Sequence, residues 1–233
     1  MSWVASTLAL YQRAFRQAAV LSLRNWPVLG TVFVYTTVMG ASLVVAGALG
    51  ILGGILLSLV WAACVGSFLY LVEMMIRTGR VSLADFRRSM GAYLWDVVGV
   101  TFILWVVFVV LTPILLAFPQ GPAIILGLNL IVFVLFNAVP ELIYLGHCSS
   151  LELLGESYTF ITENWVEWFP ANIAASLLLG LVSVVPLTGV AAVAQTAVAA
   201  LLLYFVMVMR GLLFLELHGS TRRGRAFRHR MGG

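Results

Sequence analysis

Three acidic residues, Glu73, Glu141 and Glu216, stand near the ends of long apolar runs in this chain of 233 residues. A carboxylate within a membrane can bind an ion or relay a proton, so acids in apolar segments often mark a transport path. The depth of each acid in the membrane distinguishes an ion or proton path from simple anchoring of the helix. At about 1.5 Å per helical residue, Glu141 lies about 27 Å and Glu73 about 33 Å into their runs, against a hydrocarbon core of about 30 Å. We therefore expect interfacial acids that anchor or pair helices, with transport as the alternative.

Four further acids are expected on one face of a helix that begins near Ser150. They recur at spacings of four, seven and four, as Glu152, Glu156, Glu163 and Glu167. Apolar residues recur at helical spacing on the other face, as Leu151, Leu154, Tyr158, Ile161, Trp165 and Trp168. Because four like charges on one face repel one another, we expect arginine to meet them. The arginines come either from a partner subunit or from the preceding surface helix, through Arg80, Arg87 and Arg88.

Other reactive residue types lack the spacing that catalysis or metal binding requires. His147 and Cys148 are adjacent, but the other two histidines stand in another segment and paired-cysteine spacing is absent from the sequence. Ser149 and Ser150 are explained by helix capping. The sequence contains no phosphate loop, nucleotide fingerprint or nucleophile elbow. It therefore predicts a protein that is not an enzyme and holds no cofactor or metal.

Three amide side chains, Asn129, Asn137 and Gln195, are placed more deeply in the apolar runs than the acids. Asn129 and Asn137 are eight residues apart, so they lie near one face of a helix. We expect them to form hydrogen bonds between helices, with a permeation path as the alternative.

The composition sets the class of protein. Apolar residues make up 62% of the sequence and charged residues 9%, whereas ordinary domains carry about a quarter charged residues. The mean hydropathy is +1.07. One soluble core could not hide this much apolar surface, and several runs exceed the ~18 residues that mark a bilayer span. The sequence predicts an all-α, polytopic membrane protein with six transmembrane helices.

Short uncharged turns join the six predicted spans into three hairpins. The spans are expected at residues 28–48 and 51–76, 97–117 and 123–145, and 171–185 and 190–217. A cytoplasmic amphipathic helix is predicted before each hairpin, at 5–24, at 82–95 and from Ser150 to Trp168.

The first two surface helices have apolar faces that can be read from the spacing. The face of the first is predicted to contain Leu8, Tyr11, Phe15 and Ala18. The second begins with a capping box of Ser82 and Asp85. It is predicted to bury Leu83, Phe86, Met90 and Leu94.

The positions of the arginines predict the topology. All 13 basic residues are arginine, and apart from Arg210 they lie near the termini or in the first long connection. Because basic residues stay cytoplasmic, both termini and the first long connection are expected on that side, and the even number of spans places the third surface helix there too. The basic C-terminal tail is expected to contact anionic lipid head groups rather than nucleic acid.

The order of elements indicates a pseudo-threefold internal repeat. The three surface helices open alike, at Thr7-Leu8, Ser82-Leu83 and Ser150-Leu151. Glu73 and Glu141 each precede the next of these serines by nine residues. We divide the single membrane domain, 1–233, into repeats at 5–76, 77–145 and 146–218, followed by the tail at 219–233.

Two short motifs support a family resemblance. The first is Glu141 followed by Ser150-Leu151-Glu152 and Ser157, and the second is the ending Leu213-Phe214-Leu215-Glu216-Leu217-His218. In these motifs the chain resembles the membrane domain that accompanies some bacterial glycerophosphoryl diester phosphodiesterases, and related six-span bacterial proteins of unassigned function. Leu153 departs from the pattern, because a small residue is usual there, and no phosphodiesterase domain is attached. The resemblance implies a multi-pass protein of the bacterial cytoplasmic (inner) membrane and supports the fold more than an activity.

Together these features predict a non-catalytic membrane scaffold or accessory subunit that presents amphipathic helices at the cytoplasmic membrane surface. Its expected partners are the lipid bilayer, anionic head groups and other membrane-protein subunits. One alternative is a transporter or lipid-translocating subunit, suggested by the repeats and the short fifth span. A membrane-embedded enzyme acting on lipid is a further alternative that depends on the resemblance alone.

Overall fold

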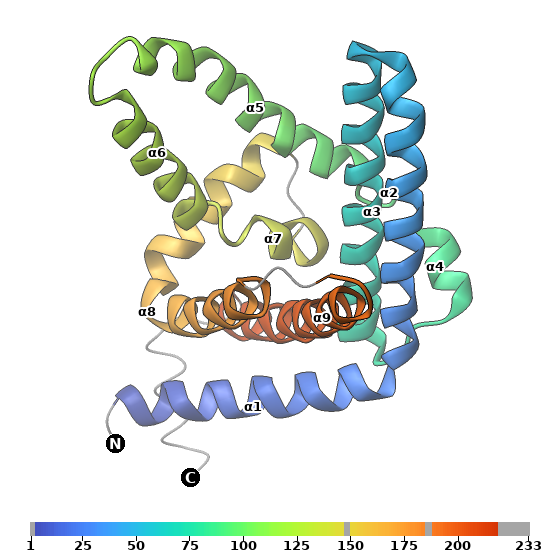
Figure 1. The fold of residues 1–233 in the computed structure, drawn as a ribbon. Helices are drawn as coiled ribbons and strands as arrows, with labels where there is room; N and C mark the ends of the chain where they lie inside the picture. Colours follow the sequence, from blue (N-terminus) through green and yellow to red (C-terminus); the bar gives the residue numbers. More distant parts are fainter. Residues whose placement is uncertain (1–2, 147–149, 185–187, 219–233) are drawn as a thin grey trace. The chain divides into compact units, whose positions relative to one another are not determined.

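The computed structural model describes residues 3–146, 150–184 and 188–218, which are helical over most of their length and contain no strand. The basic tail and the pair His147 and Cys148 lie outside the described residues. Figure 1 labels the helices in chain order. They are α1 (Trp3–Arg24), η1 (Trp26–Leu29), α2 (Gly30–Leu49), α3 (Ile51–Thr78), α4 (Leu83–Ser89), α5 (Leu94–Leu116), α6 (Gly121–Leu135), α7 (Val139–Leu145), α8 (Ser150–Ser183) and α9 (Val190–His218).

Six of these helical segments are long and apolar enough to cross a membrane, which confirms the predicted class. They are Trp26–Leu49, Ile51–Thr78, Leu94–Leu116, Gly121–Leu145, Leu151–Val182 and Val190–His218. The spans are longer than predicted, because helix continues through positions that were assigned to turns or surface segments.

Exposed hydroxyl groups on the spans satisfy their hydrogen bonds within their own helix. Thr36 donates to the carbonyl of Val32 at 2.8 Å, and Ser42 and Ser58 each donate to the carbonyl four residues earlier. In hydrocarbon there is no water to accept these protons, so polar groups must find partners inside the protein. This pattern suits helices whose outer surface faces lipid.

The chain divides into two compact units. The first unit is formed by residues 1–37, 71–85 and 164–233, as far as these are described, and the second by residues 38–70 and 86–163. The boundaries fall inside α2, α3, α4 and α8, so each unit combines pieces of more than one predicted repeat. The threefold repeat stays a prediction.

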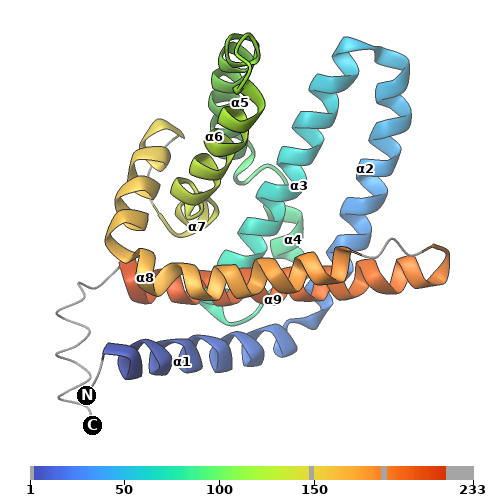
Figure 2. The same ribbon diagram turned by 60° about the vertical axis from the view of Figure 1, so that its left-hand side comes forward.

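In the first unit, α1 lies along α9, and the C-terminal half of α8 lies beside α9 (Figures 1 and 2). Arg13 bonds to Glu216, whereas Tyr204 bonds near Ser22, so α1 and α9 run antiparallel. Close packing is possible because two of the buried α1 residues are alanine. The buried face consists of Leu10, Ala14 and Ala18, exposed by 4% or less.

The predicted apolar face of α1 was therefore wrong in part: Ala18 is buried and Tyr11 bonds to α8 as part of the packed side, but the other two residues are not buried. Leu8 and Phe15 are more than half exposed, while Leu10 and Ala14 are buried. Helical spacing identifies apolar stripes but does not determine which stripe packs on protein, because lipid also accepts apolar residues. Phe15 keeps one protein contact, edge-to-face with Phe205 at 5.1 Å.

The second surface helix is much shorter than predicted. The predicted capping box is confirmed, since Ser82 N donates to Asp85 Oδ2 at 2.8 Å and Asp85 N donates to Ser82 Oγ at 3.2 Å. However, α4 ends at Ser89, and Leu83 and Met90 are exposed rather than buried. Gly91 has a φ of 88°, a conformation open mainly to glycine, and redirects the chain before α5.

The third surface helix and the fifth span form one continuous helix, α8, with Pro170 inside it. The prediction that Pro170 begins a separate span was wrong. The predicted apolar face was also wrong in part, because Leu151, Tyr158 and Trp165 are more than half exposed. Ile161 and Trp168 of the predicted face are buried, together with Leu153, Ser157 and Phe160, which were not predicted.

The second unit contains two tight hairpins. Helices α5 and α6 pack together after the turn at residues 117–120. Helix α3 approaches α2 so closely that a Cβ atom on Gly53 would lie 2.1 Å from the carbonyl oxygen of Ala46. Glycine is therefore required at that crossing.

Candidate functional site

The side chain of Asn25 connects the end of α1 to the segment between α3 and α4. Its Nδ2 donates to the carbonyl of Gly79 at 3.2 Å, and its Oδ1 accepts a hydrogen bond from Val81 N at 2.9 Å. Nδ2 also lies 2.9 Å from the carbonyl of Leu21. Asn25 is 5% exposed, so these bonds are formed largely away from solvent. They fix the point at which the chain leaves α1.

Tyr204 of α9 reaches the same point from the other side. Its hydroxyl lies 3.0 Å from the carbonyl oxygen of Asn25 and 3.3 Å from that of Ser22, and can donate its one proton to either. Helix ends leave carbonyls without helical amide partners; the Asn25 carbonyl accepts from Val28 N at 3.0 Å and lies within reach of the Tyr204 hydroxyl as well. Tyr204 is 1% exposed, so its hydroxyl adds a buried hydrogen bond at the carbonyls that end α1.

Tyr11 forms a similar contact with α8. Its hydroxyl donates to the carbonyl of Glu167 at 2.6 Å, close to Pro170, where α8 lacks an amide. Burial raises the pKa of Tyr11 from 10.0 to about 12; a hydrogen bond with the backbone of Ala171 opposes this rise, and the Glu167 carboxylate adds to it. A neutral, donating Tyr11 is thereby retained at all ordinary pH values.

Ser157 of α8 bonds to the backbone at the break between α6 and α7. Pro140 has no N–H, so the Phe136 carbonyl accepts from Val139 N instead, at 3.2 Å. The Leu135 carbonyl loses its helical partner in this rearrangement, and Ser157 Oγ of α8 donates to it at 2.9 Å. The predicted continuous fourth span is therefore interrupted at residues 136–138, at the cost of one intrahelical bond that Ser157 replaces.

Among the predicted interfacial acids, Glu216 and Glu73 each lie beside an arginine. Glu216 lies 3.2 Å from Arg13, with side chains 38% and 61% exposed, and Glu73 lies 2.8 Å from Arg77 one turn away. The third, Glu141, is fully buried in α7. The expectation of helix pairing is confirmed for Glu216, which joins α9 to α1.

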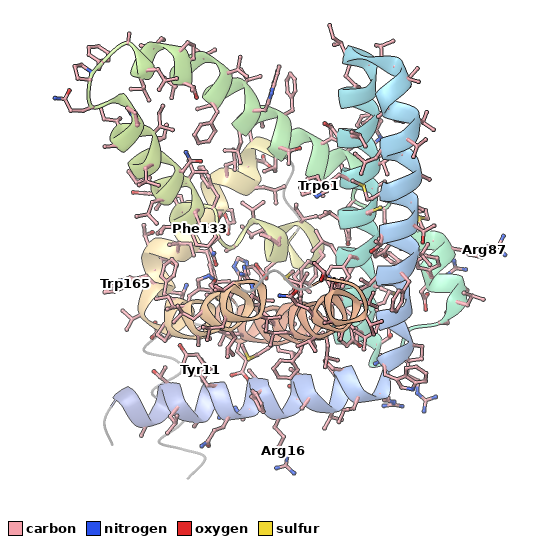
Figure 3. All side chains as sticks on the ribbon, viewed as in Figure 1. Tyr11, Arg16, Trp61, Arg87, Phe133 and Trp165 are labelled. Atoms are coloured by element: carbon pink, nitrogen blue, oxygen red, sulfur yellow. The ribbon has the colours of Figure 1, made fainter. Side chains whose placement is uncertain are left out.

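The four acids of α8 do not share one environment. Glu152 and Glu163 are exposed and Glu156 is half-buried, but Glu167 is only 4% exposed. The acidic face of α8 lies next to its buried face, and Glu167 belongs to the buried face. Their predicted partners Arg80, Arg87 and Arg88 are exposed, and Arg87 points away from α4 in Figure 3. Pairing between these two sets stays a prediction.

An aromatic cluster joins α8 to α9 within the first unit. The Arg210 guanidinium lies 5.2 Å from the ring centre of Trp168, which is fully buried. Trp168 meets Phe214 edge-to-face at 6.5 Å, and Phe214 stacks on His218 at 4.9 Å. Cation–π and aromatic contacts of this kind each contribute about 0.5–2 kcal/mol.

Sequence reasoning missed Asn25, Tyr204 and Tyr11 as the groups that join helices. A signal was present, because Asn25 directly precedes Trp26-Pro27 and Tyr204 stands inside an otherwise apolar run. Among the described residues, no three His, Cys, Asp or Glu side chains gather as a metal site. Most of the polar and charged side chains described above form hydrogen bonds to the backbone or pair with one another.

Comparison with protein-family models, curated proteins and solved structures found no match to this chain. The resemblance to the phosphodiesterase-associated membrane domain stays a prediction.

Proposed function

We propose that this protein is a non-catalytic membrane scaffold or accessory subunit that presents amphipathic helices at the cytoplasmic membrane surface. The observation that carries this proposal is the fixed docking of α1 along α9. Tyr11, Arg13 and the Tyr204–Asn25 contact attach α1 at points along most of its length. Because α1 is attached at these points and its charged side faces outward, that side can contact a partner protein or lipid.

The exposed side of α1 supports a role at the interface. Arg16 and Arg24 are exposed, and Arg16 points away from α9 in Figure 3. Leu8, Phe15 and Leu23 are more than half exposed on a neighbouring strip. A helix with an apolar strip next to a basic strip lies in the membrane interface, where arginine meets anionic head groups.

The exposed acids of α8 support a protein partner. Glu152 and Glu163 are unsuited to an anionic leaflet, so a basic surface on another subunit is the complementary partner. The exposed aromatic Tyr158 lies on a different side of the same helix and suits lipid.

The test is photo-crosslinking in cells with a reactive phenylalanine analogue at Glu163. A discrete adduct with another membrane protein, weakened by Glu152→Arg and Glu156→Arg, is the expected result. The same analogue at Tyr158 is the matched control and should give no such adduct. Adducts confined to this chain's own Arg80–Arg88 segment would instead identify internal pairing and contradict the subunit role of α8.

A second candidate, transport, is favoured by Glu141. This acid is fully buried one residue after Pro140, in a span interrupted at residues 136–138, and broken helices with buried acids recur in transporters. Purified protein in liposomes would be assayed for proton flux under an imposed gradient. Flux that Glu141→Gln abolishes would establish transport and replace the scaffold proposal.

A further inference from the structure

Helix α6 has an exposed face with a polar residue in the middle of it. Leu126, Leu130 and Phe133 are 71%, 62% and 59% exposed, and Asn129 is exposed among them. Leu126, Asn129 and Phe133 follow one another at spacings of three and four, so they form one continuous seam along the helix. Spacing of this kind is typical of a helix that packs against another helix.

Asn129 lies deep in the span. It is eight residues from the start of α6 at Gly121, or about 12 Å along the axis, within a hydrocarbon core of about 30 Å. An asparagine cannot extend to the head groups from this depth, because its side chain is short. Its amide therefore faces the apolar interior of the membrane.

The hydrogen bond that Asn129 forms within α6 satisfies only part of its amide. Nδ2 donates one proton to the carbonyl of Ile125 at 2.8 Å. An amide group has a second N–H and a carbonyl oxygen that also require partners. The exposed hydroxyls of Thr36 and Ser42 differ, since each has a single proton, which its own helix accepts.

We propose that the α6 seam is a self-association surface, on which Asn129 bonds to Asn129 of a second copy of this chain. The amide is both donor and acceptor, so a twofold axis at this position forms two equivalent N–H···O bonds. Leu126 and Phe133 pack on either side of the pair. A single asparagine in an apolar seam fixes register and favours a defined dimer. This inference is independent of the scaffold proposal.

The first experiment measures dimerisation of the full chain in bilayers by energy transfer at several protein-to-lipid ratios. Replacing the amide in Asn129→Leu removes the polar bonds and keeps the helix apolar, and should raise the dissociation constant about tenfold. Asn129→Gln retains an amide and should keep most of the affinity. Equal affinity of the Leu variant and the parent would overturn the proposal.

The second experiment identifies the face by disulfide crosslinking. In a chain with Cys64 and Cys148 replaced by alanine, Leu126→Cys should form a dimer on oxidation, and added Asn129→Leu should reduce it. Ile131→Cys is the matched control, because Ile131 is 55% exposed on another side of α6. Equal crosslinking from both positions, or adducts with a different protein through position 126, would exclude the proposed pairing.

Discussion

Asn25→Ala is the substitution that most directly tests how α1 is attached. The change removes the bond from Nδ2 to the Gly79 carbonyl and the bond from Val81 N to Oδ1. The bond to the Leu21 carbonyl is also lost, but Leu21 O keeps its partner because the backbone N–H of Asn25 donates to it at 3.0 Å. The loss of stability in Asn25→Ala therefore comes from these two tertiary hydrogen bonds.

The magnitude follows from what these two groups lose. Both bonds are part-buried, so the Val81 amide and the Gly79 carbonyl each lose a partner where solvent replaces it only in part. Each such group costs about 1–3 kcal/mol. We expect a loss of about 3 kcal/mol in the free energy of unfolding, which for a chain of this size lowers the melting temperature by about 6–12 °C.

The assay is thermal unfolding of the purified protein in mild detergent. Unfolding is monitored by the loss of the spectroscopic signal of tertiary structure and by proteolytic cleavage between α1 and α2. Ser42→Ala is the control, because Ser42 is only half-buried and its hydroxyl bonds within its own helix. That variant should stay within about 0.5 kcal/mol of the parent. If Asn25→Ala unfolds at the same temperature as Ser42→Ala, Asn25 does not hold α1 in place.

Three more predictions concern separate parts of the chain. Ser157→Ala should lower the free energy of unfolding by about 1–2 kcal/mol, because the Leu135 carbonyl loses its hydrogen-bond donor. Thr159→Val, a change at an exposed position, should lower it by less than about 0.5 kcal/mol, with both values measured by unfolding in detergent. The raised pKa of Tyr11 stabilises the fold below pH 10, and this contribution is lost as the pH rises toward about 12; Tyr11→Phe should therefore flatten the fall in melting temperature over that range, and an unchanged slope would contradict the assignment. An impermeant thiol reagent applied to intact cells should label cysteine at Thr78 only after lysis, and should label without lysis cysteines placed at Leu49, Gln120 and Thr188.

The class of this protein and the number of its spans could be predicted from sequence. Hydropathy and helix length are local properties, so runs such as 97–117 identify spans without knowledge of their neighbours. The capping box of Ser82 and Asp85 is also local, because its two bonds join residues three positions apart. Both predictions were confirmed for this reason.

The rotation of each surface helix could not be predicted. On α1 and α8, apolar residues occupy more than one stripe, and Leu8 and Tyr158 show that one stripe remains exposed while another packs on protein. A soluble helix would bury its most apolar stripe, but in a membrane protein lipid competes for the same residues. The choice between stripes depends on long-range contacts such as that of Tyr204 with Ser22.

The sequence by itself determined which residues lack a backbone donor, and only the tertiary structure decided whether the helix breaks there and which side chains bond to the carbonyls nearby. Pro27, Pro140 and Pro170 remove backbone donors at known positions, because proline has no N–H. Tyr204, Ser157 and Tyr11 donate to carbonyls near these prolines, and each hydroxyl comes from a different helix than the carbonyl that it meets. A missing donor is a property of one residue, whereas its replacement requires a second helix to bring a hydroxyl within about 3 Å, and only packing brings that about.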